Sequence, residues 1–332
     1  MITEPRPASD TTLGADIGDG AVKRARERKH GHPNWAVVAA IAVVVVAIML
    51  ALTARHDTPD LNIDQGAFRM PTPPVDSEYS GGNTLISIIW LGVVALIGFG
   101  LAIRDFVRTR VPLAMFVTLS APMIIFPEVF VDVMGAVWYP LSQSDEVFTI
   151  LGRQMGTFII AGWFGFGSLF MYTIYKVFER GLSTRGIWLA FLAAGIGSIV
   201  FEEILQNMGG MYLYYGNQPL IVLWKLPWWW MPCNAGGVFL AAAIAHRLRD
   251  SLRGWRGLSM LVITPASMGG VYGFIALPSW IVVNGKYNWW VTQLGGVATL
   301  VLGVVLVALI IRLVLDRDPW DLSGDPPTAL KA

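Results

Sequence analysis

The sequence predicts an all-α protein, a polytopic bundle of about eight transmembrane helices. Three observations support this fold class. First, 55% of the 332 residues are hydrophobic and only 14% are charged, whereas soluble domains carry about 25% charged residues. Second, apolar runs long enough to cross a bilayer recur along almost the whole chain. Third, most Lys and Arg residues gather in alternate loops between these runs.

Each predicted span is a mainly apolar run of about 20 residues, the length that a helix needs to cross the hydrocarbon core. The first run follows a polar leader that is too long for a cleaved signal peptide, so we expect it to remain as a signal anchor. The third run meets Pro127 and Glu128 near its far end. In order, the predicted spans are 35–54, 84–103, 111–129, 157–178, 187–205, 228–246, 258–278 and 291–315.

Two tails flank this helical domain of residues 35–315. We expect residues 1–34 to form a disordered basic tail and residues 316–332 a second, shorter tail. If the N-terminus lies inside, only five of the 24 Lys and Arg residues fall outside: Arg55, Arg69, Arg153, Lys225 and Lys286. The positive-inside rule favours this orientation, and an even number of spans returns the C-terminus to the same side. The prediction is a multi-pass cell-membrane protein with both termini in the cytoplasm.

Composition also argues against several classes of function. The four histidines lie in the tails or near loop ends, which disfavours haem, di-iron and zinc sites. The single Cys233 leaves no internal disulfide and no CxxC pair. A net charge of +1 points to no nucleic-acid partner. We therefore expect no metal and no cofactor, with membrane lipids and a lipophilic small molecule as partners.

Acidic residues gather at the predicted outer ends of two spans. Glu128 and Asp132 are four residues apart, which puts both carboxyl groups on one face if the segment stays helical past Pro127. Glu202 and Glu203 follow an apolar stretch and lie toward the outer boundary of the fifth span. Ionisable groups within a span are expensive and usually face the bundle or a wet cavity. The sequence therefore predicts an outward-side acidic pocket in which these four carboxyl groups are the candidate catalytic residues.

Polar and aromatic residues accompany the carboxyl groups at the same predicted depth. The candidate substrate-binding residues are Trp138, Tyr139, Asn207, Tyr212, Tyr215 and Asn234. Two simpler interpretations stand beside this one. Trp and Tyr at the water boundary commonly form an aromatic belt, and Glu202 and Glu203 are also compatible with solvated helix ends. The cytoplasmic loops contain no comparable cluster, which favours the pocket.

The acidic and aromatic segments EVFVDVMGAVWYP and FEEILQNMGGMYLYYGNQP, together with the size and the polar leader, resemble the AveC-type spirocyclases. These are polytopic actinobacterial membrane proteins of secondary metabolism, named for the enzyme that closes a spiroketal in avermectin biosynthesis. The resemblance covers about residues 80–315 and lies in overall character, so it carries no catalytic residue over to this chain.

The resemblance implies acid–base cyclisation or dehydration of a lipophilic, polyketide-like substrate without a cofactor. In that scheme Glu202 or Glu128 protonates a departing hydroxyl group, and Asp132 or Glu203 stabilises the resulting cation. Tyr215, Asn207 and Asn234 would orient substrate oxygens. Two other functions remain open: a membrane cyclase of the terpene or carotenoid type, and a transporter or lipid-handling protein that uses the same carboxyl groups.

Overall fold

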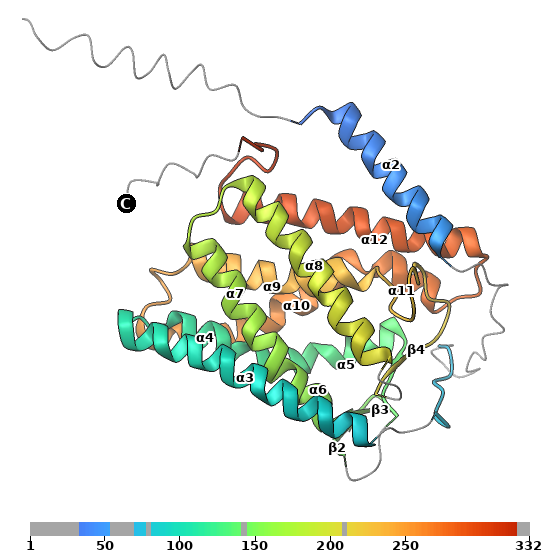
Figure 1. Ribbon diagram of the computed structural model, residues 1–332, viewed down its shortest axis with the longest axis horizontal. Coiled ribbons are helices and arrows are strands. Elements are labelled where there is room, and N and C mark those ends of the chain that lie inside the picture. The colour runs from blue at the N-terminus through green and yellow to red at the C-terminus, as the bar shows by residue number, and fades with distance from the viewer. Residues whose placement is uncertain (1–32, 54–69, 78–80, 141–144, 208–210, 324–332) are drawn as a thin grey trace, which may run out of the picture.

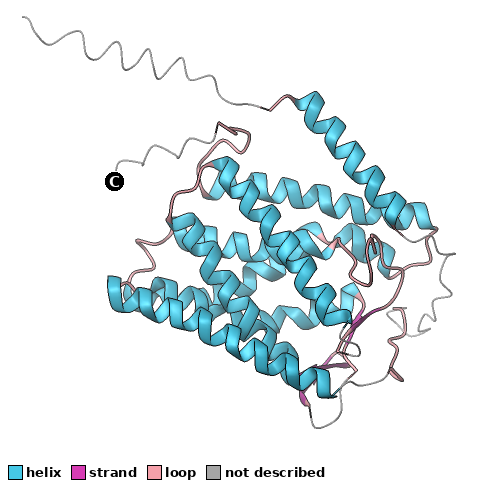
Figure 2. Cartoon of the chain, viewed as in Figure 1, coloured by secondary structure: helices cyan, strands magenta, loops and turns pink. Residues whose placement is uncertain are grey.

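A computed structural model describes residues 33–53, 70–77, 81–140, 145–207 and 211–323. The predicted tail of residues 1–34 lies almost entirely outside these ranges, as does the end of the second tail. The described chain is an all-α bundle, as the sequence predicts (Figures 1 and 2). Each of the eight predicted spans corresponds to a helix or to a stack of helical segments.

Seven helical stretches are long and apolar enough to cross a membrane, which makes this an integral membrane protein by length and composition. Three of them are single helices, α2, α3 and α8, and the others combine shorter segments. In chain order they contain α2 (Trp35–Leu52), α3 (Gly81–Thr109), α4 (Leu113–Ser120) with α5 (Ile125–Gly135), α6 (Thr157–Gly162) with α7 (Ser168–Glu179), α8 (Thr184–Asn207), α10 (Met260–Ile275) and α12 (Trp289–Leu309).

The sixth predicted span, α9 (Trp230–Arg247), is less apolar than these seven because it is the central helix. Twelve of its 18 residues are buried, and it packs against α7, α8, α10 and α12. Most of its buried residues are small, and small residues let helix backbones approach closely in a membrane bundle. A helix that touches protein on all sides needs no lipid-compatible surface, so polar residues such as Asn234 are tolerated on it.

Four helical stretches contain irregular turns, and in one of them the 3-10 turn η3 (Gly254–Ser259) leads into α10. The 3-10 turn η1 (Ala121–Ile124) joins α4 to α5, and the π-helical turn η2 (Trp163–Gly167) joins α6 to α7. A second π-helical turn, η4 (Ile310–Val314), extends α12. Pro127 lies in the first turn of α5, where a missing N–H costs no helical hydrogen bond. The segment therefore stays helical past Pro127, and α5 continues through Glu128 and Asp132, as the predicted pairing of these two carboxyl groups requires.

Short strands, which the sequence did not indicate, cover one end of the bundle. Strand β1 (Val137–Trp138) pairs antiparallel with β4 (Leu213–Tyr214). Strands β2 (Glu146–Ile150) and β3 (Arg153–Gly156) form a hairpin. Its two loop residues, Leu151 and Gly152, both have positive φ, as a type I′ turn requires. The short helix α11 (Leu277–Val283) follows α10 toward the same end.

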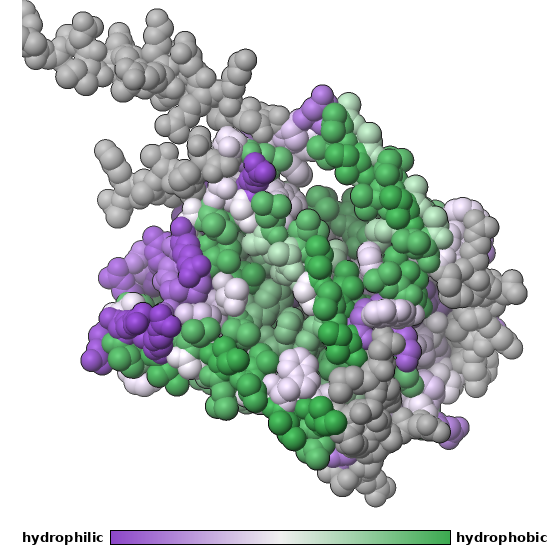
Figure 3. Space-filling model, in the orientation of Figure 1, coloured by the Kyte–Doolittle hydropathy of each residue, from purple (hydrophilic) through white to green (hydrophobic). Residues whose placement is uncertain are grey.

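The opposite end carries most of the described charge. Figure 3 shows hydrophobic side chains over much of one face and hydrophilic ones gathered where α3 and α7 finish. Trp35 at the start of α2 contacts Trp320, with ring centroids 4.9 Å apart. The two ends of the described chain therefore meet at this charged end. Its placement on the cytoplasmic side follows from the positive-inside rule and stays a prediction.

Candidate functional site

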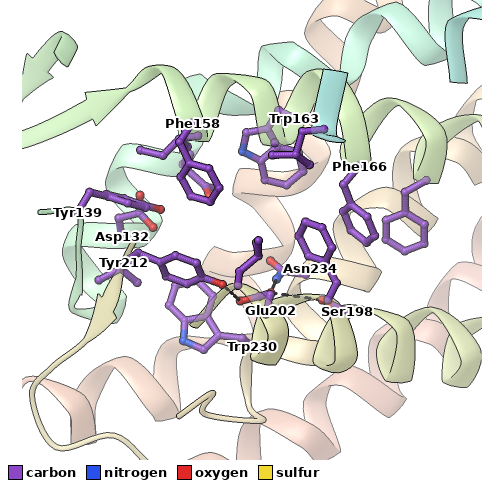
Figure 4. A pocket seen from close by; sticks show the side chains of 18 of the residues that line it. Asp132, Tyr139, Phe158, Trp163, Phe166, Ser198, Glu202, Tyr212, Trp230 and Asn234 are labelled. Atoms are coloured by element: carbon purple, nitrogen blue, oxygen red, sulfur yellow. Dashed lines mark hydrogen bonds between the residues drawn. The ribbon is translucent and has the colours of Figure 1, made fainter. Parts of the chain in front are cut away.

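A cavity of about 120 Å³ lies at the strand-covered end of the bundle, between α5, α6, α8 and α9. Three of the four predicted carboxyl groups line it: Glu128, Asp132 and Glu202. Figure 4 shows how side chains from these helices and from the strands converge on it. The other lining residues are Leu91, Val137, Tyr139, Phe158, Ile159, Gly162, Trp163, Phe166, Phe170, Ser198, Phe201, Leu205, Tyr212, Tyr214, Trp230, Asn234 and Val238.

Helix α5 supplies two of the carboxyl groups. Glu128 and Asp132 are one helical turn apart and share one face, as the sequence predicts. Asp132 is 2% exposed and interacts through a side-chain hydrogen bond with Tyr139. One of its oxygens, Oδ2, is buried without a hydrogen-bond partner in the part of the chain that the structure describes. Trp163 hydrogen-bonds Glu128. Asp132 thus keeps one oxygen available for a ligand.

Helix α8 supplies Glu202, which accepts hydrogen bonds at both oxygens. The Oε1 atom accepts from Asn234 Nδ2 at 2.8 Å and from Ser198 Oγ at 3.3 Å. The Oε2 atom accepts from the hydroxyl groups of Tyr214 at 2.9 Å and Tyr212 at 3.4 Å. An ionised carboxylate is a pure acceptor, so four donors match its charged form. This network is drawn in part in Figure 4.

A second layer of contacts orients Asn234. The Tyr272 hydroxyl donates to Asn234 Oδ1, which turns the amide so that its Nδ2 faces Glu202. Tyr272 is 1% exposed and packs against the Trp230 ring at 5.5 Å between centroids. The amide orientation is therefore set by a buried partner from α10, and hydrogen bonds link Tyr272 through Asn234 to Glu202.

Two tyrosines that line the cavity outside the spans are held as neutral donors. Burial, and then the nearby carboxyl groups of Asp132 and Glu128, raise the pKa of Tyr139 well above its usual range. Burial, and then the Glu202 carboxyl group, raise the pKa of Tyr214 well above its usual range. Both hydroxyl groups therefore stay protonated at neutral pH and donate to the carboxyl groups beside them.

The fourth predicted carboxyl group, Glu203, faces away from the cavity. Adjacent helical residues point about 100° apart, so Glu202 and Glu203 cannot share a face. Glu203 is 2% exposed, and its oxygens accept from the backbone N–H groups of Lys225 at 3.2 Å and Leu226 at 3.3 Å. These contacts give it a role in holding the segment that leads into α9.

Strand alternation separates the predicted aromatic residues in the same way. Tyr212 and Tyr214 point into the cavity, and Tyr215 falls on the other side. Tyr139 lines the cavity, and its neighbour Trp138 does not, because successive side chains of a strand face opposite ways. The described ranges include Asn207 as the last residue of α8, but its side chain lies outside what the structure describes.

Trp138 and Tyr215 instead enclose Arg153 of β3. The guanidinium carbon lies 5.6 Å from the Trp138 ring centroid and 5.5 Å from that of Tyr215, within the range of cation–π attraction. Arg153 also donates to the Tyr215 hydroxyl group and is 6% exposed. This cluster ties the hairpin to the strand-covered end beside the cavity.

The π-helical turn η2 brings Trp163 and Phe166 to the cavity. Such turns are rare and frequent at functional sites. Gly165 lies at its centre, where any side chain would collide with the Leu91 backbone of α3. The close approach of α3 at Gly165 therefore holds the turn in place, with Trp163 next to Glu128 and Phe166 stacked on Phe201 of α8.

Several residues that line the cavity, and Tyr272 behind Asn234, were absent from the predicted site. Ser198 had a usable signal, because it precedes Glu202 by one helical turn. Tyr214 had one as well, since it shares the strand face of Tyr212. Trp163 and Tyr272 had none, because a π-helical turn and a contact between distant helices leave no local pattern in the sequence.

Comparison with family models, with curated proteins and with solved structures finds no match to this chain. Within the described ranges, no group of three or more His, Cys, Asp and Glu side chains is placed to hold a metal ion. The function must therefore be argued from the cavity itself.

Proposed function

We propose that this integral membrane protein is a cofactor-independent cyclase of the AveC spirocyclase type. It would act by acid–base chemistry on a lipophilic oxygenated substrate held between α5 and α8. The observation that carries the proposal is the unequal pairing of the carboxyl groups in one cavity. Glu202 accepts from four donors, and Asp132 has a buried oxygen with no partner in the described chain.

This inequality supports different roles for the two groups. A carboxylate that accepts several hydrogen bonds is stabilised in its ionised form, which suits Glu202 as counter-ion and base. A carboxyl oxygen without a protein partner is free to carry a proton to a substrate oxygen, which suits Asp132, with Glu128 beside it. This assignment reverses the roles that the resemblance suggested for Glu202 and Asp132. Tyr139 and Asn234 would orient the substrate oxygens.

The proposed reaction is the closure of a cyclic ketal from a hydroxy-hemiketal. Asp132 gives its proton to the hemiketal hydroxyl group, and the C–O bond breaks to release water. The resulting oxocarbenium ion is stabilised by the Glu202 carboxylate and by the faces of Phe158, Tyr212 and Trp230. A second substrate hydroxyl attacks the cationic carbon to form the new C–O bond. Glu202 takes the proton of that hydroxyl, and its transfer back to Asp132 restores the starting state.

A transporter that uses the same carboxyl groups is the runner-up. It requires a polar path through the whole bundle. The region between the cavity and the charged end is instead filled by fully buried side chains of α7 and α9, including Met171, Phe239 and Ala242. A terpene- or carotenoid-type cyclase uses the same combination of acid, counter-ion and aromatic walls, so only the product distinguishes it from a ketal-forming enzyme.

The experiment is metabolite profiling by mass spectrometry in cells that lack the gene. The cells are complemented with wild type, Asp132→Asn, Glu202→Gln or Glu203→Gln, and membrane levels of each variant are matched by immunoblotting. We expect an uncyclised ketone-diol or hemiketal to accumulate in the deletion strain. Wild type and Glu203→Gln should convert it to a product that has lost one water, and the other two variants should not.

Two outcomes would overturn the proposal. An unchanged set of metabolites with a changed distribution across the membrane would favour the transporter. Full conversion by both Asp132→Asn and Glu202→Gln would remove the cavity carboxyl groups from the reaction.

A further inference from the structure

The cavity has a second, apolar end that the carboxyl chemistry does not use. Away from the tyrosines it is lined by Leu91 of α3, Phe166 and Phe170 beside η2, Phe201 of α8 and Val238 of α9. No charged side chain belongs to this group. The cavity is therefore amphipathic along its length, with oxygen-binding groups at one end and hydrocarbon at the other.

Side chains, more than packed helix backbones, close this apolar end. Helix α3 packs along α4, α6, η2 and α7, and α8 packs chiefly along α9; in the described chain α3 and α8 form no comparably packed pair. Aromatic rings bridge them instead. The Phe201 ring centroid lies 5.4 Å from that of Trp90 on α3 and 4.3 Å from that of Phe166, which is stacked on it at 12°.

The surfaces on both sides of this aromatic closure are exposed and aliphatic. Ile89 and Val93 flank Trp90 on α3 and are 60% and 53% exposed, and Val200 beside Phe201 on α8 is 54% exposed. Exposed aliphatic side chains of a membrane-spanning helix contact acyl chains. An opening between Trp90 and Phe201 would therefore lead from the cavity into the hydrocarbon core.

We propose that this apolar end is a binding subsite for the hydrocarbon chain of a membrane-dissolved ligand, which enters sideways between α3 and α8. The inference rests on the proposed function in taking the oxygenated end of that ligand to lie at Asp132 and Glu202. Rotation of the Trp90 and Phe201 side chains opens the path, and the stacked rings reseal it once the chain lies against Phe166 and Phe170. The subsite selects long, flexible or flat apolar groups over short polar ones.

The test is photolabelling of the purified protein in lipid nanodiscs with a long-chain ketone that carries a diazirine in its chain. Labelled peptides are mapped by mass spectrometry. We expect labels on the cavity-lining parts of α6, α7 and α8, and a several-fold faster rise of this labelling in Phe201→Ala. Trp90→Leu is a second opening variant if Phe201→Ala unfolds. Phe274→Ala, at a 49% exposed position of α10, is the matched control and should label as wild type does.

Labelling needs no turnover, so the subsite and the reaction are tested separately. Asp132→Asn, which we expect to be inactive, should still be labelled in the cavity. Labels confined to lipid-facing residues would overturn the subsite. Equal labelling rates in wild type, Phe201→Ala, Trp90→Leu and Phe274→Ala would overturn the sideways route, and neither result would touch the assignment of the carboxyl groups.

Discussion

Acidic residues have different partners at the two ends of the bundle. At the charged end, carboxyl groups meet cations near the surface: Asp105 lies 2.7 Å from Lys176 Nζ, and Asp250 lies 2.5 Å from Arg253. At the strand-covered end, the cavity carboxyl groups meet tyrosine hydroxyls and an amide. Exposed ion pairs contribute little to stability, whereas buried carboxyl groups for which the described residues form no salt bridge are costly to keep. This difference supports the proposed catalytic role of the cavity groups, which the surface groups do not share.

Glu202 and Glu203 repeat this contrast at neighbouring positions. Both are acidic residues of α8 at the same depth. Glu202 accepts from side chains that line the cavity, and Glu203 accepts from backbone N–H groups of the following segment. The two side chains differ only in the direction in which they leave the helix. A substitution at Glu203 is therefore a matched control for the same substitution at Glu202.

The largest expected effect comes from removing the charge of Glu202. In Glu202→Gln the turnover rate should fall by about 10²–10⁴-fold, the usual contribution of a positioned acid or base. Conversion of the accumulated metabolite by membranes from matched cultures measures it. A rate within a few-fold of wild type would contradict the proposed catalytic role of Glu202.

A smaller loss is expected when one donor to Glu202 is removed. Tyr214→Phe deletes the hydroxyl at 2.9 Å, and a hydrogen bond to a charged group contributes about 1.5–3 kcal/mol. The rate should therefore fall by about 10–100-fold. Tyr287→Phe at the same end is the control, since Tyr287 does not line the cavity. Equal turnover rates in Tyr214→Phe and Tyr287→Phe would show that the Tyr214 hydroxyl group does not contribute to the reaction.

Glu203→Gln should affect folding and spare the reaction. The amide keeps one acceptor oxygen and loses the other, so about 1–3 kcal/mol of unfolding free energy should be lost. A lower thermal midpoint in detergent, with turnover per folded molecule unchanged, is the expected result. Loss of turnover in folded Glu203→Gln would return Glu203 to the list of catalytic candidates.

The smallest effect belongs to the charged end. Lys176→Met breaks the contacts with Asp105 and Glu179, and such partly exposed pairs contribute about 0–1 kcal/mol. The thermal midpoint should move little and turnover should not change. A loss of turnover as large as that of Glu202→Gln would mean that the two ends are coupled.

The helices were predictable because their signal is local. Apolar length located the seven membrane-spanning stretches, and the remaining predicted span falls on the central helix α9. The spacing of Glu128 and Asp132 located one wall of the cavity. The choice between Glu202 and Glu203 was not predictable, because the rotation of α8 is set by its packing on α9. Trp138 and Tyr215, which the sequence placed in the site, do not line the cavity, since the sequence did not indicate the strands whose alternation turns them away.

The most direct test of the central claim uses purified protein in lipid nanodiscs and the metabolite that accumulates in the deletion strain. Wild type, Glu202→Gln and Glu203→Gln are incubated with it without added cofactor, and products are followed by mass spectrometry. We expect wild type and Glu203→Gln to form the dehydrated cyclic product, and we expect Glu202→Gln not to form it. An unchanged metabolite with folded wild type, or equal conversion by all three proteins, would contradict it.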